Sequence, residues 1–340
     1  MKIAKVACSL KRFLELVMNI VATHQFGWVE TETLTKENRQ RTQREFQPAY
    51  VHTRWNLVNS LLRLTRAQVY AFWALFISCV GFRLAGLRLG IKLILSILVN
   101  LGVLAFGFIL NDAEDYQEDR LDARKSRRNL IAAGKISKGQ AYLLSMGCAT
   151  YSVALTALLD LRAMVVISGT LLLLFLYSWH ITRLKAKFGI DLLVHGLIGG
   201  MLFIAAYLST GSELDKGLSV GLAGLFFAVD SAVSLLKHQV VDMELDKQAG
   251  LRTTTVVLGK EIICRIISSL QWILILIVLL LIGTGGIPYL TVAVYAGTNL
   301  LALLVLLYRR KTGTTIDLKK YVWVTTKVGA IVALISWYFV

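Results

Sequence analysis

Two groups of acidic and amide residues, each at the end of a long apolar stretch, carry the clearest chemical signal in this chain. The first group consists of Asn111, Asp112, Asp115 and Asp119, and the second of Asp242 and Asp246. Residues four apart lie on one face of a helix, so Asn111, Asp115 and Asp119 predict one stripe, and Asp242 and Asp246 another. Like charges at this spacing repel, and a carboxylate beside hydrocarbon is costly unless it is paired, hydrated or coordinated. Both groups therefore require a compensating cation.

The ligand atoms in both groups are oxygens of Asp and Asn, with no His or Cys among them. Such a set favours a hard ion such as Mg²⁺. Mg²⁺ takes one or two protein carboxylates, keeps water, and completes its coordination with substrate phosphates. Two facing groups therefore predict a site where Mg²⁺ holds a diphosphate. The alternative is a hydrated surface loop in each case, with the carboxylates paired to nearby Arg and Lys.

Basic residues follow each acidic group. Arg127 and Arg128 come after the first group, and Arg252 comes after the second. Guanidinium groups at these positions would hold the non-bridging oxygens of a diphosphate and stabilise it as a leaving group. The alternative is that these residues only mark the membrane face on which the loops lie.

Long apolar stretches must position these residues, because 56% of the chain is hydrophobic. Each stretch has roughly 18 or more residues, which is enough to cross a bilayer as a helix. Nine such stretches are predicted, at residues 66–86, 89–110, 139–159, 161–181, 189–210, 217–237, 263–285, 287–308 and 320–340. The sequence therefore predicts an all-α, polytopic membrane protein with about nine transmembrane helices around a central cavity.

The net charge of +16 is divided unevenly between the two sets of loops that these stretches create. Most Lys and Arg residues fall in the loops on the side of the N-terminus, including both loops that follow the acidic groups. This is the positive-inside pattern, which places that side in the cytoplasm. We therefore predict an active site that faces the cytoplasmic side of a lipid bilayer, and we do not expect nucleic-acid binding.

The N-terminal part differs in composition from the rest of the chain. Residues 1–22 mix basic and apolar side chains, which favours an amphipathic helix at the membrane surface over a cleaved signal peptide. Residues 30–55 are polar. We predict a cytoplasmic amphipathic and polar segment at residues 1–63 and a transmembrane domain at residues 64–340.

Several motifs together resemble those of the UbiA-type intramembrane prenyltransferase superfamily. The first acidic group is similar to its first metal motif, and the second group, with Gly250-x-Arg252-Thr253 after it, is similar to its second. Tyr177 and Ser178, followed by Arg183 and Lys185, are similar to a signature that lies between the two. Arg66 is similar to the Arg that opens the first crossing. The resemblance covers residues 64–340.

The resemblance implies a Mg²⁺-dependent enzyme and a role for each matching residue. The implied metal-binding residues are Asn111, Asp115, Asp119, Asp242 and Asp246. The implied catalytic residues are Asp112, Arg127, Arg128, Lys185 and Arg252, and Asp112 can be interpreted either as a base or as a metal ligand. The implied substrate-binding residues are Arg66, Tyr177 and Arg183, to which we add His238 because it lies one turn before Asp242 on the same helix face.

The implied reaction is transfer of a polyprenyl group from a polyprenyl diphosphate to a small acceptor. The allylic C–O bond ionises, and a nucleophilic atom of the acceptor captures the carbocation. An aromatic acceptor is the default expectation. A phosphorylated-sugar acceptor, or a terpene cyclase that needs no acceptor, is an alternative on the same scaffold. A cation-coupled transporter is an alternative from a different class.

The chain departs from the family pattern in two places. Ala67 stands where the family often has Pro after the Arg of the first crossing. Arg124 and Asn129 stand in the loop where the family tends to have Asn-Arg-Pro and Arg-Pro. That loop helps to shape the acceptor side, so the sequence leaves the identity of the acceptor open.

Overall fold

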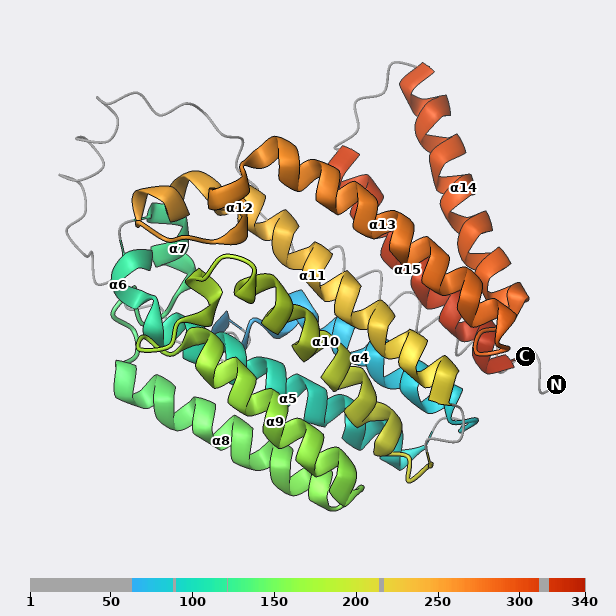
Figure 1. Ribbon diagram of the computed structural model, residues 1–340, viewed down its shortest axis with the longest axis horizontal. Helices are drawn as coiled ribbons and strands as arrows, with labels where there is room; N and C mark the ends of the chain where they lie inside the picture. The colour runs from blue at the N-terminus through green and yellow to red at the C-terminus, as the bar shows by residue number, and fades with distance from the viewer. Residues whose placement is uncertain (1–62, 88–89, 121, 214–216, 312–317, 340) are drawn as a thin grey trace.

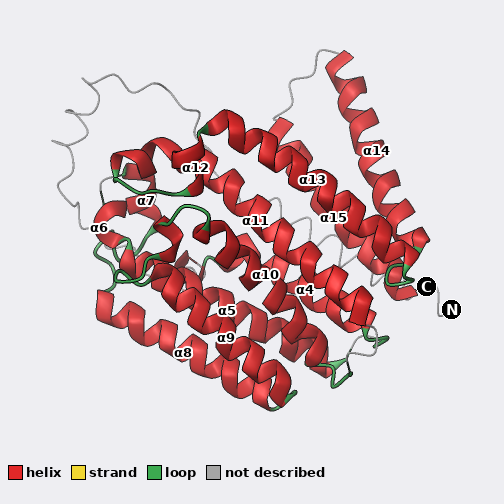
Figure 2. Cartoon of the chain, in the orientation of Figure 1, coloured by secondary structure: helices red, strands yellow, loops and turns green. Residues whose placement is uncertain are grey.

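The structure is a computed structural model that describes residues 63–87, 90–120, 122–213, 217–311 and 318–339. Every regular element in these ranges is a helix (Figure 1, Figure 2). The α-helices are α4 (Ala67–Leu84), α5 (Ile91–Glu114), α6 (Tyr116–Asp119), α7 (Ala123–Arg128), α8 (Lys138–Ala157), α9 (Leu161–Ser178), α10 (Ile190–Leu208), α11 (Gly217–Gln248), α12 (Thr254–Leu258), α13 (Lys260–Gly283), α14 (Tyr289–Lys311) and α15 (Leu318–Phe339). A short 3₁₀ helix, η1 (Leu184–Ala186), precedes α10.

Each of the nine predicted apolar stretches coincides with one of the longer helices, which confirms the all-α, polytopic fold. In chain order these helices are α4, α5, α8, α9, α10, α11, α13, α14 and α15. Five helices in the described ranges are long and apolar enough to cross a membrane, namely α5, α9, α10, α11 and α13. α11 has 32 residues. At about 1.5 Å per residue it is longer than a bilayer core is thick, so its last turns project beyond the apolar region.

Successive long helices run in opposite directions, so their ends form two faces (Figure 1). The short helices α6, α7 and α12 gather at one end of the bundle, where α5 and α11 end. This end carries both acidic groups, and we refer to it as the motif face. The opposite face is formed by the ends of α4 and α13 and the starts of α11 and α14.

Polar side chains mark the starts of several helices on both faces. Ser137 and Gln140 form a reciprocal capping box at the start of α8. Asp160 accepts two backbone N–H groups at the start of α9, and Thr253 accepts one at the start of α12. Such caps satisfy N–H groups that have no partner within their helix. They fix where α8 and α12 begin on the motif face and where α9 begins on the opposite face.

Glycine lets α10 and α11 pack closely against each other. A Cβ atom on Gly199 would stand 2.6 Å from the carbonyl oxygen of Phe227 and 2.6 Å from Cβ of Ser231. Gly196 and Gly200 face backbone carbonyl oxygens of α11 in the same way, at 3.1 Å. Small residues let helix backbones approach closely in a membrane. This contact fixes the position of α11 relative to α10 along the helix axes.

We expect Gly199→Ala to lower the free energy of unfolding by about 2 kcal/mol, because the added methyl group must push the α11 backbone aside. Thermal unfolding of the purified protein in detergent measures the effect. Gly147→Ala in α8 is the matched control, since a Cβ there meets nothing within 4 Å. The control should unfold at or slightly above the temperature of the unchanged protein. Equal unfolding temperatures for both variants would contradict the close α10–α11 contact.

The predicted N-terminal segment, residues 1–63, lies outside the described residues apart from Arg63. Its amphipathic helix and its division from the transmembrane domain at residues 64–340 stay predictions.

Candidate functional site

Asp112 is the most deeply buried member of the first acidic group, with 1% of the residue exposed. Its Oδ1 atom accepts a short hydrogen bond from Arg66, so the two form a buried ion pair between the start of α4 and the end of α5. Arg66 has a left-handed backbone, with φ 52°, and its guanidinium carbon lies 5.3 Å from the centre of the Phe108 ring. The second oxygen, Oδ2, is buried and has no hydrogen-bond partner among the described residues. Because buried polar atoms are almost always paired, this oxygen is the one left for a ligand.

Asn129 completes the buried cluster around Asp112. Its side-chain nitrogen donates to the carbonyl oxygen of Asp112 at 2.8 Å and to Oδ2 of Asp119 at 2.9 Å. Its side-chain oxygen accepts the N–H groups of Ile131 and Ala132. Burial raises the pKa of the Asp119 carboxyl group, and the hydrogen bond from Asn129 opposes that rise. Asp119 and Asn129 therefore hold the loop after α6 against the end of α5.

The helix that carries the first group is interrupted at Asp115, where the sequence predicts a continuous stripe. α5 ends at Glu114, Asp115 has φ −93° and ψ 3°, and α6 begins one residue later. Lys185 contacts both Asn111 and Asp115, whereas Asp119 binds Asn129. The predicted three-residue stripe is therefore divided into a pair that shares one cation and a third residue that supports a loop.

Lys185 and Arg183 bring positive charge to the first group from the segment after α9. The Nζ atom of Lys185 lies 2.8 Å from Oδ1 of Asn111 and 2.5 Å from Oδ2 of Asp115. Arg183 binds both carboxylate oxygens of Glu118, at 2.5 and 2.6 Å, and reaches Oδ1 of Asp115 at 3.4 Å. Although burial alone would lower it, the hydrogen bonds to Glu118 and the charge of Asp115 hold the pKa of Arg183 above its ordinary value. Like Arg66, Arg183 has a left-handed backbone, with φ 40°.

The second acidic group faces the first from the last turns of α11. The Nζ atom of Lys125 lies 3.4 Å from Oδ2 of Asp242. The Asp246 carboxylate is close enough to Asp115, Lys125 and Lys185 to interact with each of them electrostatically. The structure therefore brings the two acidic groups together at the motif face, with two lysines between them.

The oxygen atoms of the two acidic groups suit a hard divalent cation, although lysine side chains of the same protein bind them in this structure. Within the described ranges, no three His, Cys, Asp or Glu side chains stand close enough together to hold a metal ion. Instead, Lys185 bridges Asn111 and Asp115, and Lys125 lies beside Asp242. An ammonium group between two oxygens shows that these oxygens already bind a cation in common. A divalent ion that displaced the lysines would find the oxygen-only donors that Mg²⁺ prefers, with water and diphosphate oxygens to complete its coordination.

Three further predicted residues lie close to the acidic groups. Arg128 is exposed and interacts electrostatically with the carboxylates of Asp112, Asp119 and Asp242. His238 is also exposed, on α11, and lies near the charges of Asp242 and Arg128. The half-buried Tyr177 has Asp115 and Asp246 among its electrostatic neighbours.

Two predicted residues lie at the edge of the motif face. The side chain of Arg127 is exposed, and its backbone carbonyl oxygen accepts a hydrogen bond of 2.6 Å from Arg63. Arg252 is exposed in the connection between α11 and α12. The structure brings both to the motif face and leaves their guanidinium groups accessible from solution.

Asp191, near the start of α10, is a candidate that sequence reasoning missed. Its carboxylate is fully buried and accepts hydrogen bonds from Gln239 at 2.7 Å, from the N–H of Thr254 at 2.8 Å and from the Thr254 hydroxyl group. The Thr254 hydroxyl oxygen in turn accepts the N–H of Gly189 at 2.9 Å, and Gln239 accepts the Thr255 hydroxyl group at 3.0 Å. This network joins α10, α11 and α12, and it fixes the turn that follows the second acidic group. The one feature of the sequence that could have pointed to Asp191 is its position, as a carboxylate at the start of an apolar stretch, six residues after Lys185.

Glu114, an acidic residue within the first group's segment to which the sequence assigned no role, forms a second cluster on the outer side of that group. Its carboxylate accepts a short hydrogen bond from the Tyr142 hydroxyl group and lies 3.3 Å from Nδ1 of His180 and 3.7 Å from Nζ of Lys138. Lys138 also lies 5.5 Å from the centre of the Tyr116 ring and 5.4 Å from that of Tyr142. The cluster therefore ties the end of α5 to the start of α8 and to the segment that leads to Arg183 and Lys185.

Comparison with known proteins identifies relatives of the whole helical bundle. The model of the UbiA prenyltransferase family matches residues 67–326. Among curated proteins, the chain is similar to a digeranylgeranylglyceryl phosphate synthase from Methanopyrus kandleri. The two are 28% identical over 230 residues, which cover 67% of this chain and 81% of that protein.

Solved structures of two UbiA homologs share the fold. A UbiA homolog from Archaeoglobus fulgidus, bound to GPP and Mg²⁺, is 21% identical with a TM-score of 0.60, over 82% of this chain and 98% of that one. A UbiA homolog from Aeropyrum pernix K1 is 17% identical with a TM-score of 0.61, over 78% of this chain and 95% of that one. The family model spans more than half of the chain, and the helical architecture agrees with it. This chain therefore belongs to the UbiA prenyltransferase family of integral membrane proteins.

Proposed function

We propose that this prenyltransferase moves a polyprenyl group from a polyprenyl diphosphate to a small acceptor, with Mg²⁺ held between the two acidic groups. The observation that carries the proposal is the meeting of Asp115 and Asp246, with Lys125 and Lys185, at the end of a membrane bundle. Related proteins support it, because the Archaeoglobus fulgidus homolog has been solved with GPP and Mg²⁺ and with DMAPP and Mg²⁺. Related proteins of this fold thus bind prenyl diphosphates together with the metal.

The residues divide into metal ligands and supports. Asn111, Asp115, Asp242 and Asp246 would hold the metal, and Asp119 would support them through Asn129. When bound, Mg²⁺ neutralises diphosphate charge and makes that group a better leaving group. Lys185 and Lys125 lie beside these carboxylates, so once the metal takes their place they would donate to diphosphate oxygens nearby.

The reaction itself separates charge, and the surrounding side chains stabilise each part. The allylic C–O bond breaks with its electron pair going to the diphosphate, which Arg128, Lys185 and Arg252 stabilise. Arg66 and Arg183 hold the substrate-facing ends of α4 and η1, and His238 contacts the bound substrate from α11. The face of the Tyr177 ring stabilises the allylic cation. A nucleophilic atom of the acceptor then forms the new bond, and its proton goes to the unpaired Oδ2 oxygen of Asp112.

A phosphate-bearing acceptor has more support than the aromatic acceptor expected by default. The similar Methanopyrus kandleri protein is named for a glyceryl phosphate product. In this chain the exposed Arg127 and Arg128 lie at the motif face, where an anionic acceptor would arrive from solution. We therefore propose that these two residues attract a phosphorylated acceptor, with an aromatic acceptor as the competing possibility.

The motif face is proposed to be cytoplasmic. The loops on this side carry most of the Lys and Arg residues, which is the charge distribution of a cytoplasmic face. Labelling with a membrane-impermeant maleimide tests the orientation, in a variant that keeps one cysteine at Ala133 (Ala133→Cys) in a cysteine-free background. Protection of this cysteine in sealed right-side-out vesicles, and labelling after they are opened, is the expected result; labelling in the intact vesicles would contradict the orientation.

The reaction is tested with protein purified in detergent and supplied with Mg²⁺. Geranyl, farnesyl, geranylgeranyl and longer diphosphates are each offered with an aromatic hydroxy acid, with a glyceryl phosphate or with no acceptor. We expect diphosphate release that depends on the phosphate-bearing acceptor. Diphosphate release with the aromatic acid alone would show that the acceptor is aromatic and not phosphate-bearing. Release of a cyclic hydrocarbon without acceptor would identify a cyclase, and no release with any donor would overturn the proposal.

Removal of divalent metal is expected to stop diphosphate release without unfolding the protein. The lysines already neutralise Asp115 and Asp242, so the fold does not rest on the metal. EDTA treatment should therefore reduce the rate by at least about 10³-fold and leave the thermal unfolding temperature nearly unchanged. Added Mg²⁺ should restore the rate. Full activity after exhaustive chelation would show that the acidic groups serve another purpose.

A further inference from the structure

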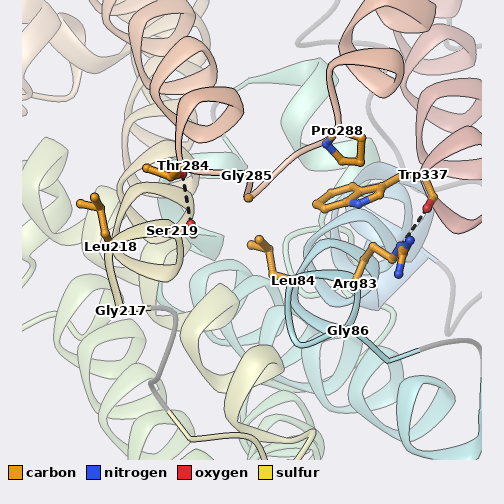
Figure 3. Close-up of a pocket in the computed structure, with 11 residues that line it drawn as sticks. Arg83, Leu84, Gly86, Gly217, Leu218, Ser219, Thr284, Gly285, Pro288 and Trp337 are labelled. Atoms are coloured by element: carbon orange, nitrogen blue, oxygen red, sulfur yellow. Dashed lines mark hydrogen bonds between the residues drawn. The ribbon is translucent and has the colours of Figure 1, made fainter. Parts of the chain in front are cut away.

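A cavity of about 550 Å³ lies at the opposite face (Figure 3). Both acidic groups lie at the other end of the bundle, on the motif face. It forms where α4 and α15 end, where α11 begins, and at the connection between α13 and α14. Helix ends in a membrane protein lie at the level of the lipid headgroups. The cavity is therefore placed at the headgroup level of one leaflet, where phosphate groups are concentrated.

The charge in this cavity is positive. Arg83 is the one charged residue among the described residues that line it. Its Nε atom donates to the carbonyl oxygen of Trp337 at 2.8 Å, and its guanidinium carbon lies 6.0 Å from the centre of the Tyr338 ring. In the described ranges its two terminal nitrogens have no hydrogen-bond partner, and no carboxylate pairs with it. Figure 3 shows the guanidinium group beside Trp337 at one side of the cavity, so the described part of the lining carries a positive charge and no carboxylate.

The remaining lining suits an amphiphile. Ser219 and Thr284 form a hydrogen bond of 3.1 Å with each other, and their hydroxyl groups lie across the cavity from Arg83 (Figure 3). Leu84 and Leu218 give the same cavity apolar surface. The Ser219 O–H is donated to Thr284, and the Thr284 O–H is donated to the carbonyl oxygen of Leu281 at 3.2 Å. The guanidinium group of Arg83 can donate to phosphate oxygens, and the leucines exclude water beside it. The lining thus offers an anion site with adjoining hydrocarbon contact.

We propose that this cavity binds the phosphate group of an anionic amphiphile, with Arg83 as the counter-ion and donor. The phosphate can come from a bilayer phospholipid or from a soluble phosphate ester, and the chemistry of recognition is the same. The site lies at the opposite end of the bundle from the proposed prenyl-transfer site and does not depend on it.

Among the described residues of this face, a second arginine, Arg162, provides a matched control. Arg162 lies 3.0 Å from a carboxylate oxygen of Asp160 and 2.8 Å from one of Glu213, so its charge is already neutralised. It does not line the cavity. If any arginine at this depth in the membrane attracted lipid, replacing Arg162 would weaken lipid binding as much as replacing Arg83. If the cavity is the binding site, only replacement of Arg83 weakens it.

The test measures lipid binding to the full chain after delipidation in detergent, by native mass spectrometry. Phosphatidylglycerol is compared with phosphatidylcholine, whose choline neutralises the phosphate within the same headgroup, and glycerol phosphate is added as a soluble competitor. Variants are Arg83→Gln, Arg83→Lys, Thr284→Phe and Arg162→Gln. Thr284→Phe fills the cavity without removing the hydrogen bond between Arg83 and Trp337. It therefore distinguishes loss of the cavity from loss of the contact that attaches α15.

We expect the unchanged protein to retain phosphatidylglycerol roughly fivefold to tenfold better than phosphatidylcholine. Arg83→Gln and Thr284→Phe should each abolish this preference, Arg83→Lys should keep part of it, and Arg162→Gln should keep all of it. Displacement by glycerol phosphate would assign a soluble phosphate ester as ligand, and its failure to displace would assign a bilayer lipid. The absence of a preference, or its survival in both Arg83→Gln and Thr284→Phe, would overturn the proposal. Diphosphate release measured on the same preparations reports separately on the prenyl-transfer site.

Discussion

Replacing Asp115 with Asn is expected to lower Mg²⁺-dependent diphosphate release by about 10³-fold. Asp115 is where the two acidic groups meet, because its carboxylate contacts Lys185 and Arg183 and interacts electrostatically with Asp246. An amide at this position keeps the size of the side chain and one oxygen, but it loses the negative charge that would attract the divalent ion. The expected loss therefore falls on metal binding and on the chemical step that depends on it.

The same change should leave the fold nearly intact. Lys185 keeps its hydrogen bond of 2.8 Å to Asn111, and Arg183 keeps both of its hydrogen bonds to Glu118. The thermal unfolding temperature in detergent, measured beside the rate of diphosphate release over a Mg²⁺ titration, separates the two effects. Asp160→Asn is the matched control, because it makes the same substitution at the opposite face, where Asn also caps a helix well. A rate for Asp115→Asn within a few-fold of that for Asp160→Asn would refute the placement of Asp115 in the metal site.

Replacing Asp191 with Ala is expected to have the largest effect on stability, about 3 to 5 kcal/mol. The buried carboxylate accepts donors from Gln239, from the N–H and hydroxyl groups of Thr254 and from the N–H of Leu192. Alanine would leave these donors buried without an acceptor, and each such group costs free energy. Asparagine is expected to be intermediate, because it keeps one acceptor oxygen but turns an N–H₂ group toward existing donors.

Two readouts distinguish this role from general destabilisation. Thermal unfolding in detergent reports the loss of stability. Hydrogen exchange followed by mass spectrometry should show α12 (Thr254–Leu258) opening before the α10–α11 packing is lost, since α12 is attached through Thr254. Diphosphate release under conditions where the variant stays folded should fall as well, because the turn that carries Arg252 would move. Exchange in α12 equal to that of the unchanged protein would show that Asp191 does not position this turn.

The positions of the helices could be predicted from the sequence because hydrophobic length is a local property. Each apolar stretch is long enough to cross a bilayer, and every one of them folds as a helix. The two acidic groups could be found for a similar reason, since clustered carboxylates at the end of an apolar stretch are rare and conspicuous. That the two groups meet follows from the topology, because both close segments that end on one face.

The partners of these residues could not be predicted, because they come from distant parts of the chain. Nothing near Asp112 indicates that Arg66 will bind it, and a lone Asp at position 191 is an ordinary start to a helix until Thr254 and Gln239 are placed around it. Asn129 is visible in the sequence only as a departure from the family pattern, and nothing there indicates that it supports both Asp112 and Asp119. The break at Asp115 was also hidden, since the spacing of the motif suits a continuous helix equally well.

The lysines that occupy the acidic groups have a consequence for how the protein is made. A cluster of bare carboxylates would hinder insertion of α5 and α11 into a membrane, and it would make assembly wait for a divalent ion. Because Lys185 and Lys125 belong to the same chain, they neutralise Asp115 and Asp242 as soon as the helices and loops that carry these residues pack together. Under the proposed function, the bundle can therefore fold before the metal binds, and the metal can leave without unfolding the protein.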